Sequence, residues 1–392
     1  MYASALPVAA TYFLIWDPPA GWSQSALFFY LLGLAIFVRV SISLYEIPST
    51  ALGPELAKSY DDRSALFGWR LFFAWVIGSI MSVANFSLIF PAFATAAIPN
   101  GQFNRDAYEL YGLIASVLIF IAILVSAAGT HNRIPQLRTA QPRPAGRPRA
   151  IFRQIFATIA NRDFAALFVA AIFGAIATGI SASLSFYFSA YFWGFSSQQI
   201  GLITMSVFAS AAIGGGLAPT VTRRLGKQRG AMVIGILAGL ALPLPIIARL
   251  LGLLPANGDP AIFWIVFIVT MVDVGLIICF QALTASMLAD LVEQAEVRTG
   301  QRSEGIFFAA NTFIRKAVQG LGVMAASLVL TLAEFPKGAT PDQVGPDSLF
   351  RLGATYVPAI WLVWAGMILA VSRYRLSRAD HEANLKTLNE RA

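Results

Sequence analysis

Residues 39–56 read RVSISLYEIPSTALGPEL and close an apolar run that begins near residue 25. Four polar side chains recur there at offsets of 0, 4, 7 and 11, namely Arg39, Ser43, Glu46 and Thr50. On a helix this spacing places them in one stripe. Because an ionised group within lipid costs roughly 2.5–3.5 kcal/mol on insertion scales, the stripe should face a partner helix or a hydrated cavity. That arrangement is typical of a solute pathway.

The composition is that of a polytopic membrane protein. Of the 392 residues, 57% are hydrophobic and 12% are charged, whereas a soluble domain carries about 25% charged residues. Both histidines, His131 and His381, lie in polar segments, which argues against a histidine metal site within the membrane. No nucleotide-binding loop, zinc-ligand set or catalytic-triad spacing is present. We therefore expect no enzyme activity and no bound metal or cofactor.

Ten apolar runs are candidates for membrane spans, which need about 20 residues each. The first is short, and the runs fall near residues 1–16, 25–47, 68–91, 109–129, 164–190, 198–219, 230–252, 261–286, 305–333 and 351–373. Alternate connections are rich in Lys and Arg, so they are expected in the cytoplasm together with both termini. This placement accounts for the net charge of +8 without a nucleic-acid partner. The Ala, Arg and Gly content suits a bacterial inner membrane.

Two stretches of the chain repeat each other. Residues 51–73, ALGPELAKSYDDRSALFGWRLFF, match residues 286–308, SMLADLVEQAEVRTGQRSEGIFF, without a gap at an offset of 235. Glu55 is thereby paired with Asp290. Parallel halves of this kind build transporters with a binding site near the middle of the membrane.

The same offset predicts the domain organisation. It places Met1 opposite residue 236, inside the third span of the second half, so we expect a twelve-span design without its first two helices. The predicted parts are an N-terminal bundle of four spans over 1–130, a cytoplasmic linker over 131–163, a C-terminal bundle of six spans over 164–375 and a cytoplasmic tail over 376–392.

The two repeat regions carry a resemblance to a known family. Residues 45–64, YEIPSTALGPELAKSYDDRS, resemble the segment after the fourth span of the glycoside–pentoside–hexuronide:cation symporters. Residues 287–308 resemble the loop before their eleventh span. This family belongs to the major facilitator superfamily, and the similarity runs over essentially the whole chain. It implies an all-α membrane protein of about ten helices (4 + 6) in two pseudo-symmetric bundles. It also implies alternating-access symport of a sugar or glycoside with Na⁺ or H⁺.

The resemblance also implies a solute site shared by the two halves. Glu46 matches the acid that hydrogen-bonds the sugar, where an aspartate is usual, and Arg70 matches the arginine that clasps sugar hydroxyls. Lys316 and Thr312 match a lysine and a threonine of the eleventh span. Ser43 matches the residue that lends a hydroxyl to the coupling cation.

The sequence departs from this family at two places. Thr50 stands where melibiose-type members stack an aromatic ring on the sugar, and it is retained as a candidate substrate contact. The acids of the second span, which are the main cation ligands of the family, have no counterpart in this chain.

Further polar residues allow two interpretations each. Asp273, with Thr270 and Gln281, could bind the solute or balance the charge of Lys316. Arg39 could belong to the pathway or pair with a neighbour structurally. Four charged residues of the repeated loops are expected to lock the cytoplasmic face through salt bridges: Asp62, Arg63, Glu296 and Arg298.

Two alternatives to sugar transport stay open from the sequence. A lysolipid or another amphiphile could be the solute, since related lysolipid symporters share the fold and Thr50 replaces the stacking aromatic. The chain could also be a transport-inactive fragment or a membrane scaffold. Under each of these interpretations we expect a monomer that contacts membrane lipid. As a transporter it would also bind a small-molecule solute.

Overall fold

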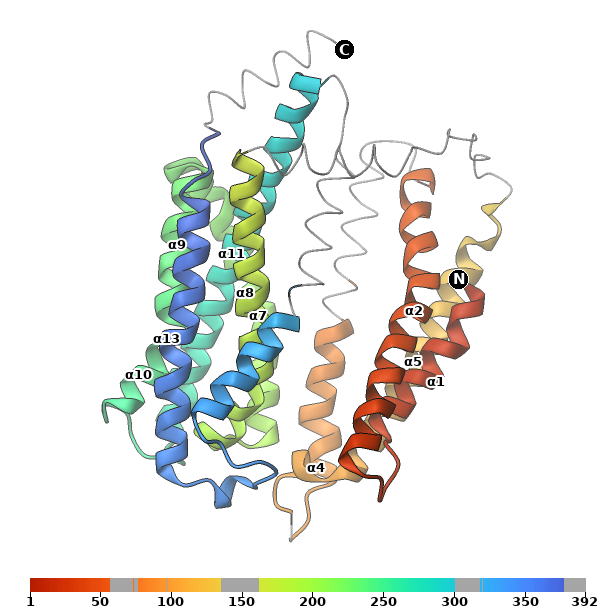
Figure 1. Ribbon diagram of the computed structural model, residues 1–392, viewed down its shortest axis with the longest axis vertical. Helices are drawn as coiled ribbons and strands as arrows, with labels where there is room; N and C mark the ends of the chain where they lie inside the picture. Colours follow the sequence, from red (N-terminus) through yellow and green to blue (C-terminus); the bar gives the residue numbers. More distant parts are fainter. Residues whose placement is uncertain are drawn as a thin grey trace. The chain divides into compact units, whose positions relative to one another are not determined.

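The computed structural model describes residues 1–56, 73, 77–96, 98–134, 162–299, 318 and 320–376. These residues form helices and the loops that join them (Figure 1). The chain divides into two compact units. Unit 1 comprises Met1–Pro144 and Ser197–Thr204, and unit 2 comprises Ala145–Ser196 and Met205–Ala392.

Unit 1 is organised around the short helix α1 (Tyr2–Trp16), which packs against both of the unit's long helices. Ala5 and Val8 of α1 meet Ile123 in a core to which Val38 and Tyr45 add partly buried side chains. The other elements of the unit are α2 (Gln24–Leu56), η1 (Asn85–Ile89), α4 (Phe90–Ala92), η2 (Gly101–Phe103) and α5 (Arg105–His131).

Helix α5 begins with a regular N-cap. The side chain of Asn104 accepts a hydrogen bond from the backbone N–H of Asp106 at 3.1 Å, which satisfies one of the free donors of the first turn. The carboxylate of Asp106 in that turn is favourable next to the positive end of the helix dipole. These local signals fix the start of the helix.

Unit 2 contains the longest helix of the described chain, α11 (Pro260–Thr299), which packs against α9 (Lys227–Ala241). Helix α13 (Pro346–Val371) packs against α7 (Arg162–Phe186) and also against α9. The remaining elements of the unit are η4 (Tyr187–Phe192), α8 (Ser197–Leu225, from Met205 onward), α10 (Leu244–Leu250) and η5 (Pro341–Gln343).

Glycine allows a very close contact between α8 and α11 of unit 2. A Cβ atom on Gly214 of α8 would lie 2.6 Å from the carbonyl oxygen of Gly275 on α11, so no side chain fits there. Small residues at helix crossings let two backbones approach in this way. The neighbouring Gly215 and Gly216 have open space around them. The contact therefore depends on one position of the glycine run.

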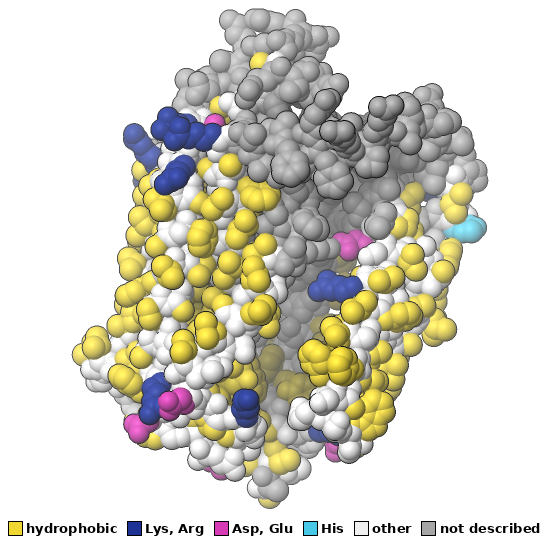
Figure 2. Space-filling model, viewed as in Figure 1, with side chains coloured by type: hydrophobic (Ala, Val, Ile, Leu, Met, Phe, Trp, Pro, Cys, Tyr) yellow, Lys and Arg dark blue, Asp and Glu magenta, His cyan; other side chains and the backbone are white. Residues whose placement is uncertain are grey.

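Seven helices of the described residues are long and apolar enough to cross a membrane. Three shorter apolar helices cover Tyr2–Trp16, Ile77–Ala92 and Gly320–Leu332. An all-α architecture is thus confirmed, whereas the count of ten spans stays a prediction. Figure 2 shows hydrophobic side chains over the middle of the unit 2 helices and Lys and Arg near both ends. Helix α8 finishes with Arg223 and Arg224.

Two boundaries differ from the apolar runs. The run near 230–252 is divided into α9 and α10 around Pro243, because proline lacks the N–H that a continuous helix requires. Helix α11 continues to Thr299, beyond the predicted end near residue 286. Its last turns are polar, so hydropathy alone does not include them.

Candidate functional site

The polar stripe of α2 lies within a span of high hydropathy, Gln24–Glu46. Arg39 is exposed, and Ser43 and Glu46 are half-buried. The hydroxyl of Ser43 donates to the carbonyl oxygen of Arg39 at 2.8 Å, which is the usual way for a serine within a helix to satisfy its proton. The lone pairs of this hydroxyl remain on its oxygen as acceptors.

A different face of α2 forms the core of unit 1. Ser41 is 3% exposed, and the Tyr45 hydroxyl donates to the hydroxyl of Ser126 on α5 at 2.9 Å. Arg39 and Glu46 each follow a core position, Val38 and Tyr45, by one residue, which is about 100° around the helix. The charged side chains are therefore presented beside the core of unit 1, outside its packed centre.

Several predicted residues lie outside the described residues: Arg70, Thr312, Lys316, Asp62 and Arg63. Thr50 lies on α2, and Glu296 and Arg298 lie near the end of α11, but only their backbone is described. Their roles in solute binding and in closing the protein stay predictions.

Asp273 and Gln281 both belong to α11, but their side chains lie in different environments. Asp273 is 2% exposed and Gln281 is exposed. Asp273 belongs to a buried stripe that repeats every seven residues with Val266, Phe280 and Met287. It therefore points into the packed side of α11, and Gln281 does not share that environment.

A buried ion pair that we did not predict joins two helices of unit 2. Lys227, the first residue of α9, donates to both carboxylate oxygens of Asp290 on α11, at 2.6 and 2.7 Å. The side chain of Asp290 is 8% exposed and that of Lys227 is 26% exposed. The repeat had singled out Asp290 as the partner of Glu55, but nothing in the linear sequence linked it to a lysine 63 residues earlier.

The same end of unit 2 is joined to the segment that follows α13. The side-chain amide of Gln228 donates to the carbonyl oxygens of Ser372 and Tyr374. Tyr374 is 1% exposed, and burial, together with the charges of Asp290 and Asp163, raises the pKa of its hydroxyl. Asp163 in turn accepts from the backbone N–H of Arg375 at 2.7 Å. Helices α7, α9, α11 and α13 are thereby connected at one end.

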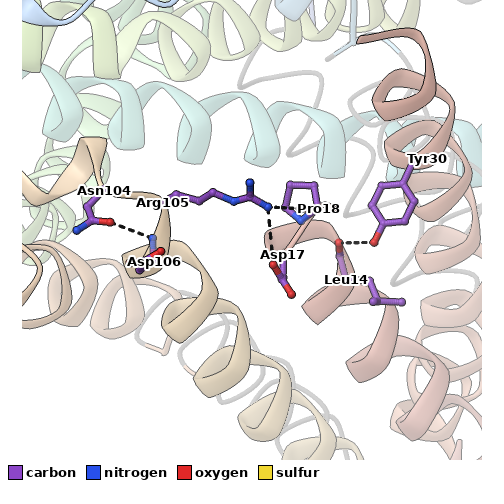
Figure 3. Close-up of polar contacts among 7 residues, drawn as sticks. All are labelled: Leu14, Asp17, Pro18, Tyr30, Asn104, Arg105 and Asp106. Carbon is purple, nitrogen blue, oxygen red and sulfur yellow. Dashed lines mark hydrogen bonds and ion pairs between the residues drawn. The ribbon is translucent and has the colours of Figure 1, made fainter. Parts of the chain in front are cut away.

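In unit 1 the ion pair and the hydrogen bonds near the helix ends are exposed (Figure 3). Arg105 contacts the carbonyl oxygen of Pro18 and lies 4.0 Å from the carboxylate of Asp17, with both charged side chains about half exposed. The Tyr30 hydroxyl donates to the Leu14 carbonyl oxygen at 3.0 Å. These contacts hold the connection between α1 and α2 to the start of α5.

No cluster of three or more His, Cys, Asp or Glu with the spacing of a metal site occurs in the described ranges. The chemistry that the described side chains offer is hydrogen bonding and charge. Arg39, Ser43 and Glu46 present a donor, a hydroxyl and an acceptor in one stripe, which suits a polar solute or a cation.

Comparisons with known proteins agree on one family. The family model for MFS/sugar transport proteins matches residues 1–378. An uncharacterized symporter of Synechocystis sp. is 25% identical, over 92% of this chain and 76% of its own length. A lactose permease of Lactobacillus delbrueckii is 21% identical, over 89% of this chain and 54% of its own length.

A third relative has a different kind of solute in its name. The sodium-dependent lysophosphatidylcholine symporter 1-A of Danio rerio is 22% identical, over 98% of this chain and 73% of its own length. This chain thus spans about half to three quarters of the lengths of these relatives. The apolar helices and the match over residues 1–378 together identify a multi-pass integral membrane protein of a symporter family, and the chain belongs to the MFS/sugar transport proteins.

Proposed function

We propose that the protein is a symporter that moves a sugar or glycoside together with Na⁺ or H⁺ by alternating access. One observation carries this proposal. A stripe of Arg39, Ser43 and Glu46 lies within an apolar span and beside the core of unit 1. Such groups are stable at membrane depth only when they face protein or water, so the stripe marks a solute pathway.

In this proposal the side chains of the pathway replace the water around the solute. Glu46 accepts hydrogen bonds from sugar hydroxyls, and Arg70, Thr312 and Lys316 donate or exchange hydrogen bonds from the other elements of the pathway. The negative charge of Glu46 makes cation binding and solute binding mutually favourable. With Na⁺ as the coupling cation, Ser43 would offer its hydroxyl oxygen to the ion.

The proposed setting is a bacterial inner membrane with both termini in the cytoplasm. The end of unit 2 with Arg223, Arg224 and Lys227 would face the cytoplasm, in agreement with the positive-inside rule. Asp62, Arg63, Glu296 and Arg298 would then close this side in one state of the cycle. The name of the lactose permease relative supports a disaccharide as the first solute to test.

The decisive experiment is uptake into membrane vesicles of radiolabelled mono- and disaccharides, lactose included, for the unchanged protein and for Glu46→Ala. Removing a hydrogen-bonding partner that is charged should lower uptake about 10- to 100-fold. The matched control is Glu109→Ala, which removes an exposed carboxylate from α5 of the same unit and should leave uptake unchanged. Equal uptake by Glu46→Ala and the unchanged protein would falsify the proposal.

Competition identifies the class of solute in the same assay. An excess of unlabelled sugar should suppress the uptake of labelled sugar, and lysophosphatidylcholine below its micelle concentration should not. Suppression by the lysolipid alone would reassign the pathway to an amphiphile.

A further inference from the structure

Asp273 is a buried acid near the middle of a membrane span. It lies thirteen residues after Pro260 in the span Pro260–Leu288, which is about 20 Å along the helix. Its exposure is 2%, and its Oδ1 atom has no hydrogen-bond partner among the described residues. An ionised carboxylate in such a place is strongly unfavourable unless it is paired, and an acid commonly becomes neutral by taking up a proton.

The turn of α11 that carries Asp273 is held in position by α8. The Ser210 hydroxyl donates to the carbonyl oxygen of Met271 at 2.8 Å. Gly275 lies so close to α8 that an added Cβ atom would be 3.0 Å from Ile213. Met271, two positions before Asp273, and Gly275, two positions after it, are thus both in contact with α8. Because these contacts involve the backbone, the carboxyl group cannot escape burial by a small rotation of the helix.

A hydroxyl pair lies on the other helices near this acid. Tyr356 of α13 is 3% exposed, and its hydroxyl is within the electrostatic range of the Asp273 carboxylate. The hydroxyl oxygens of Tyr356 and Ser181 are 3.4 Å apart. The Tyr356 ring is fixed by Phe188, with ring centroids 4.7 Å apart. The three polar side chains therefore come from three packed helices, α11, α13 and α7.

The other titratable groups of these helices lie elsewhere. On the described parts of α7, α8, α9 and α13, charged residues occur in the first and last turns, apart from Arg351 in the second turn of α13, which contacts Glu334. Tyr356 is the titratable group near Asp273. Cys279 is buried on α11 itself, six residues further on. Arg249 of α10 lies over the Phe192 ring at 4.5 Å. Lys316, whose charge Asp273 could balance according to the sequence, lies outside the described residues.

We propose that Asp273 is the site that binds and releases the coupling proton, with the Tyr356 hydroxyl as a polar neighbour of the acid. The proposal rests on the proposed symport function and assigns its coupling ion as H⁺. A metal cation needs enough protein oxygens to replace its hydration shell, whereas a proton needs one oxygen, and Oδ1 of Asp273 is such an oxygen. The site belongs to unit 2, whereas the polar stripe of α2 belongs to unit 1.

The proton balance of the cycle follows directly. The Asp273 carboxylate takes up one proton from water and becomes a neutral acid, which can remain buried while the protein changes its conformation. When water reaches the acid in the other conformation, the carboxylic O–H bond breaks and the proton returns to water. One proton is carried per cycle, and the carboxylate is regenerated. In this role Asp273 does not contact the sugar.

Infrared spectroscopy of the purified protein in lipid tests the proton on Asp273 without any transport assay. A protonated carboxylic acid has a carbonyl stretch that ionised carboxylates lack and that shifts in D₂O. The unchanged protein should show this band at neutral pH, and Asp273→Asn should lose it. Asp347→Asn, which alters an exposed acid at the start of α13, should keep it. An unaltered band in Asp273→Asn, or no band in the unchanged protein, would overturn the proposal.

A second variant protects the test against misfolding of Asp273→Asn. Tyr356→Phe keeps the ring against Phe188 and removes only the hydroxyl. It should retain the band but move its position, because the dipole of a nearby hydroxyl shifts the carbonyl stretch. A band at the same position in Tyr356→Phe would contradict the assignment of the hydroxyl as the neighbour of the acid.

Transport in proteoliposomes separates this proposal from the proposed function. With a pH gradient and no Na⁺, the unchanged protein should accumulate sugar, while Asp273→Asn should lose accumulation and retain exchange of internal for external sugar. Sugar accumulation that needs Na⁺ and ignores the pH gradient would refute the proton site and leave symport standing. If no sugar moves in any variant while the infrared band behaves as expected, symport of sugar fails and proton binding by Asp273 stands.

Discussion

Unit 1 and unit 2 place polar groups within their apolar helices in opposite ways. The most apolar part of α2 in unit 1 has 6% of its residues buried, against 33% for that of α11 in unit 2. Accordingly, α2 carries Arg39 and Glu46 beside its core, whereas α11 encloses Asp273 within one. A thinly packed helix can therefore present charge to a solute, whereas a closely packed helix can isolate a charge from water.

The same contrast holds for the ion pairs at the helix ends. In unit 2 Lys227 and Asp290 are largely buried, and in unit 1 Arg105 and Asp17 are about half exposed. Burial makes the loss of one partner costly because the other charge is left without compensation, while an exposed charge is compensated by water. Four substitutions test this difference, and they are given in descending order of expected effect.

Lys227→Met should have the largest effect on stability. It leaves the Asp290 carboxylate buried without its partner, for which a cost of about 3–5 kcal/mol is typical. Since Lys227 is about a quarter exposed, we expect about 2–3 kcal/mol after allowing for solvent screening. Thermal unfolding in detergent measures the loss. The double variant Lys227→Met/Asp290→Leu should regain most of it, and a single variant as stable as the unchanged protein would break the comparison.

Gly214→Ala should destabilise unit 2 by about 1–3 kcal/mol through overpacking. The new methyl group would lie 2.6 Å from the Gly275 carbonyl oxygen and would push α8 away from α11. The matched control is Gly215→Ala, where the added Cβ meets open space and a gain of about 0.5–1 kcal/mol in helix propensity is expected. Unfolding midpoints of the two variants should therefore move in opposite directions, and equal shifts would show that the close contact is unimportant.

Tyr374→Phe should alter the dependence of stability on pH. Burial raises the pKa of the Tyr374 hydroxyl above 10.0, so the folded protein keeps this proton when the unfolded chain has lost it. The contribution of this proton to the stability of the fold is fully present below pH 10 and is lost as the pH rises further. Between pH 8 and pH 11 the free energy of unfolding should fall less for Tyr374→Phe than for the unchanged protein. Tyr2→Phe, at an exposed tyrosine, serves as the control and should behave like the unchanged protein.

Arg105→Ala should have the smallest effect. The charges of Arg105 and Asp17 are 4.0 Å apart and exposed, and pairs of this kind contribute about 0–1 kcal/mol. The unfolding midpoint should fall by much less than for Lys227→Met, and added salt should reduce the remaining difference. A loss of stability as large as that of Lys227→Met would mean that exposure does not determine how much the two ion pairs contribute.

Much of the fold was predictable because membrane spans depend on local properties. The apolar runs over 25–47, 109–129 and 351–373 correspond to α2, α5 and α13, and the two copies of the repeat both begin in the last turns of a long helix. The division around Pro243 was missed because a run of high hydropathy conceals a local break in hydrogen bonding.

The candidate site was predictable only in part. Offsets along α2 were sufficient to align Arg39 with Glu46, but they did not reveal which face packs against α1 and α5. For Asp273 the sequence left solute binding and charge balance equally open, because nothing in a linear pattern reports whether a residue is enclosed. The Lys227–Asp290 pair was not predicted for the same reason, since its partners are 63 residues apart.

The sequence alone is sufficient to predict a bundle of apolar helices with charged residues at membrane depth, because the length of an apolar run and the helical period are properties of neighbouring residues. The tertiary structure adds that Asp273 is buried where α11 packs against α8, that the Tyr356 hydroxyl is within its electrostatic range, and that Lys227 is the partner of Asp290. Burial and pairing arise from contacts between helices that are distant in the chain, and packing alone brings those helices together.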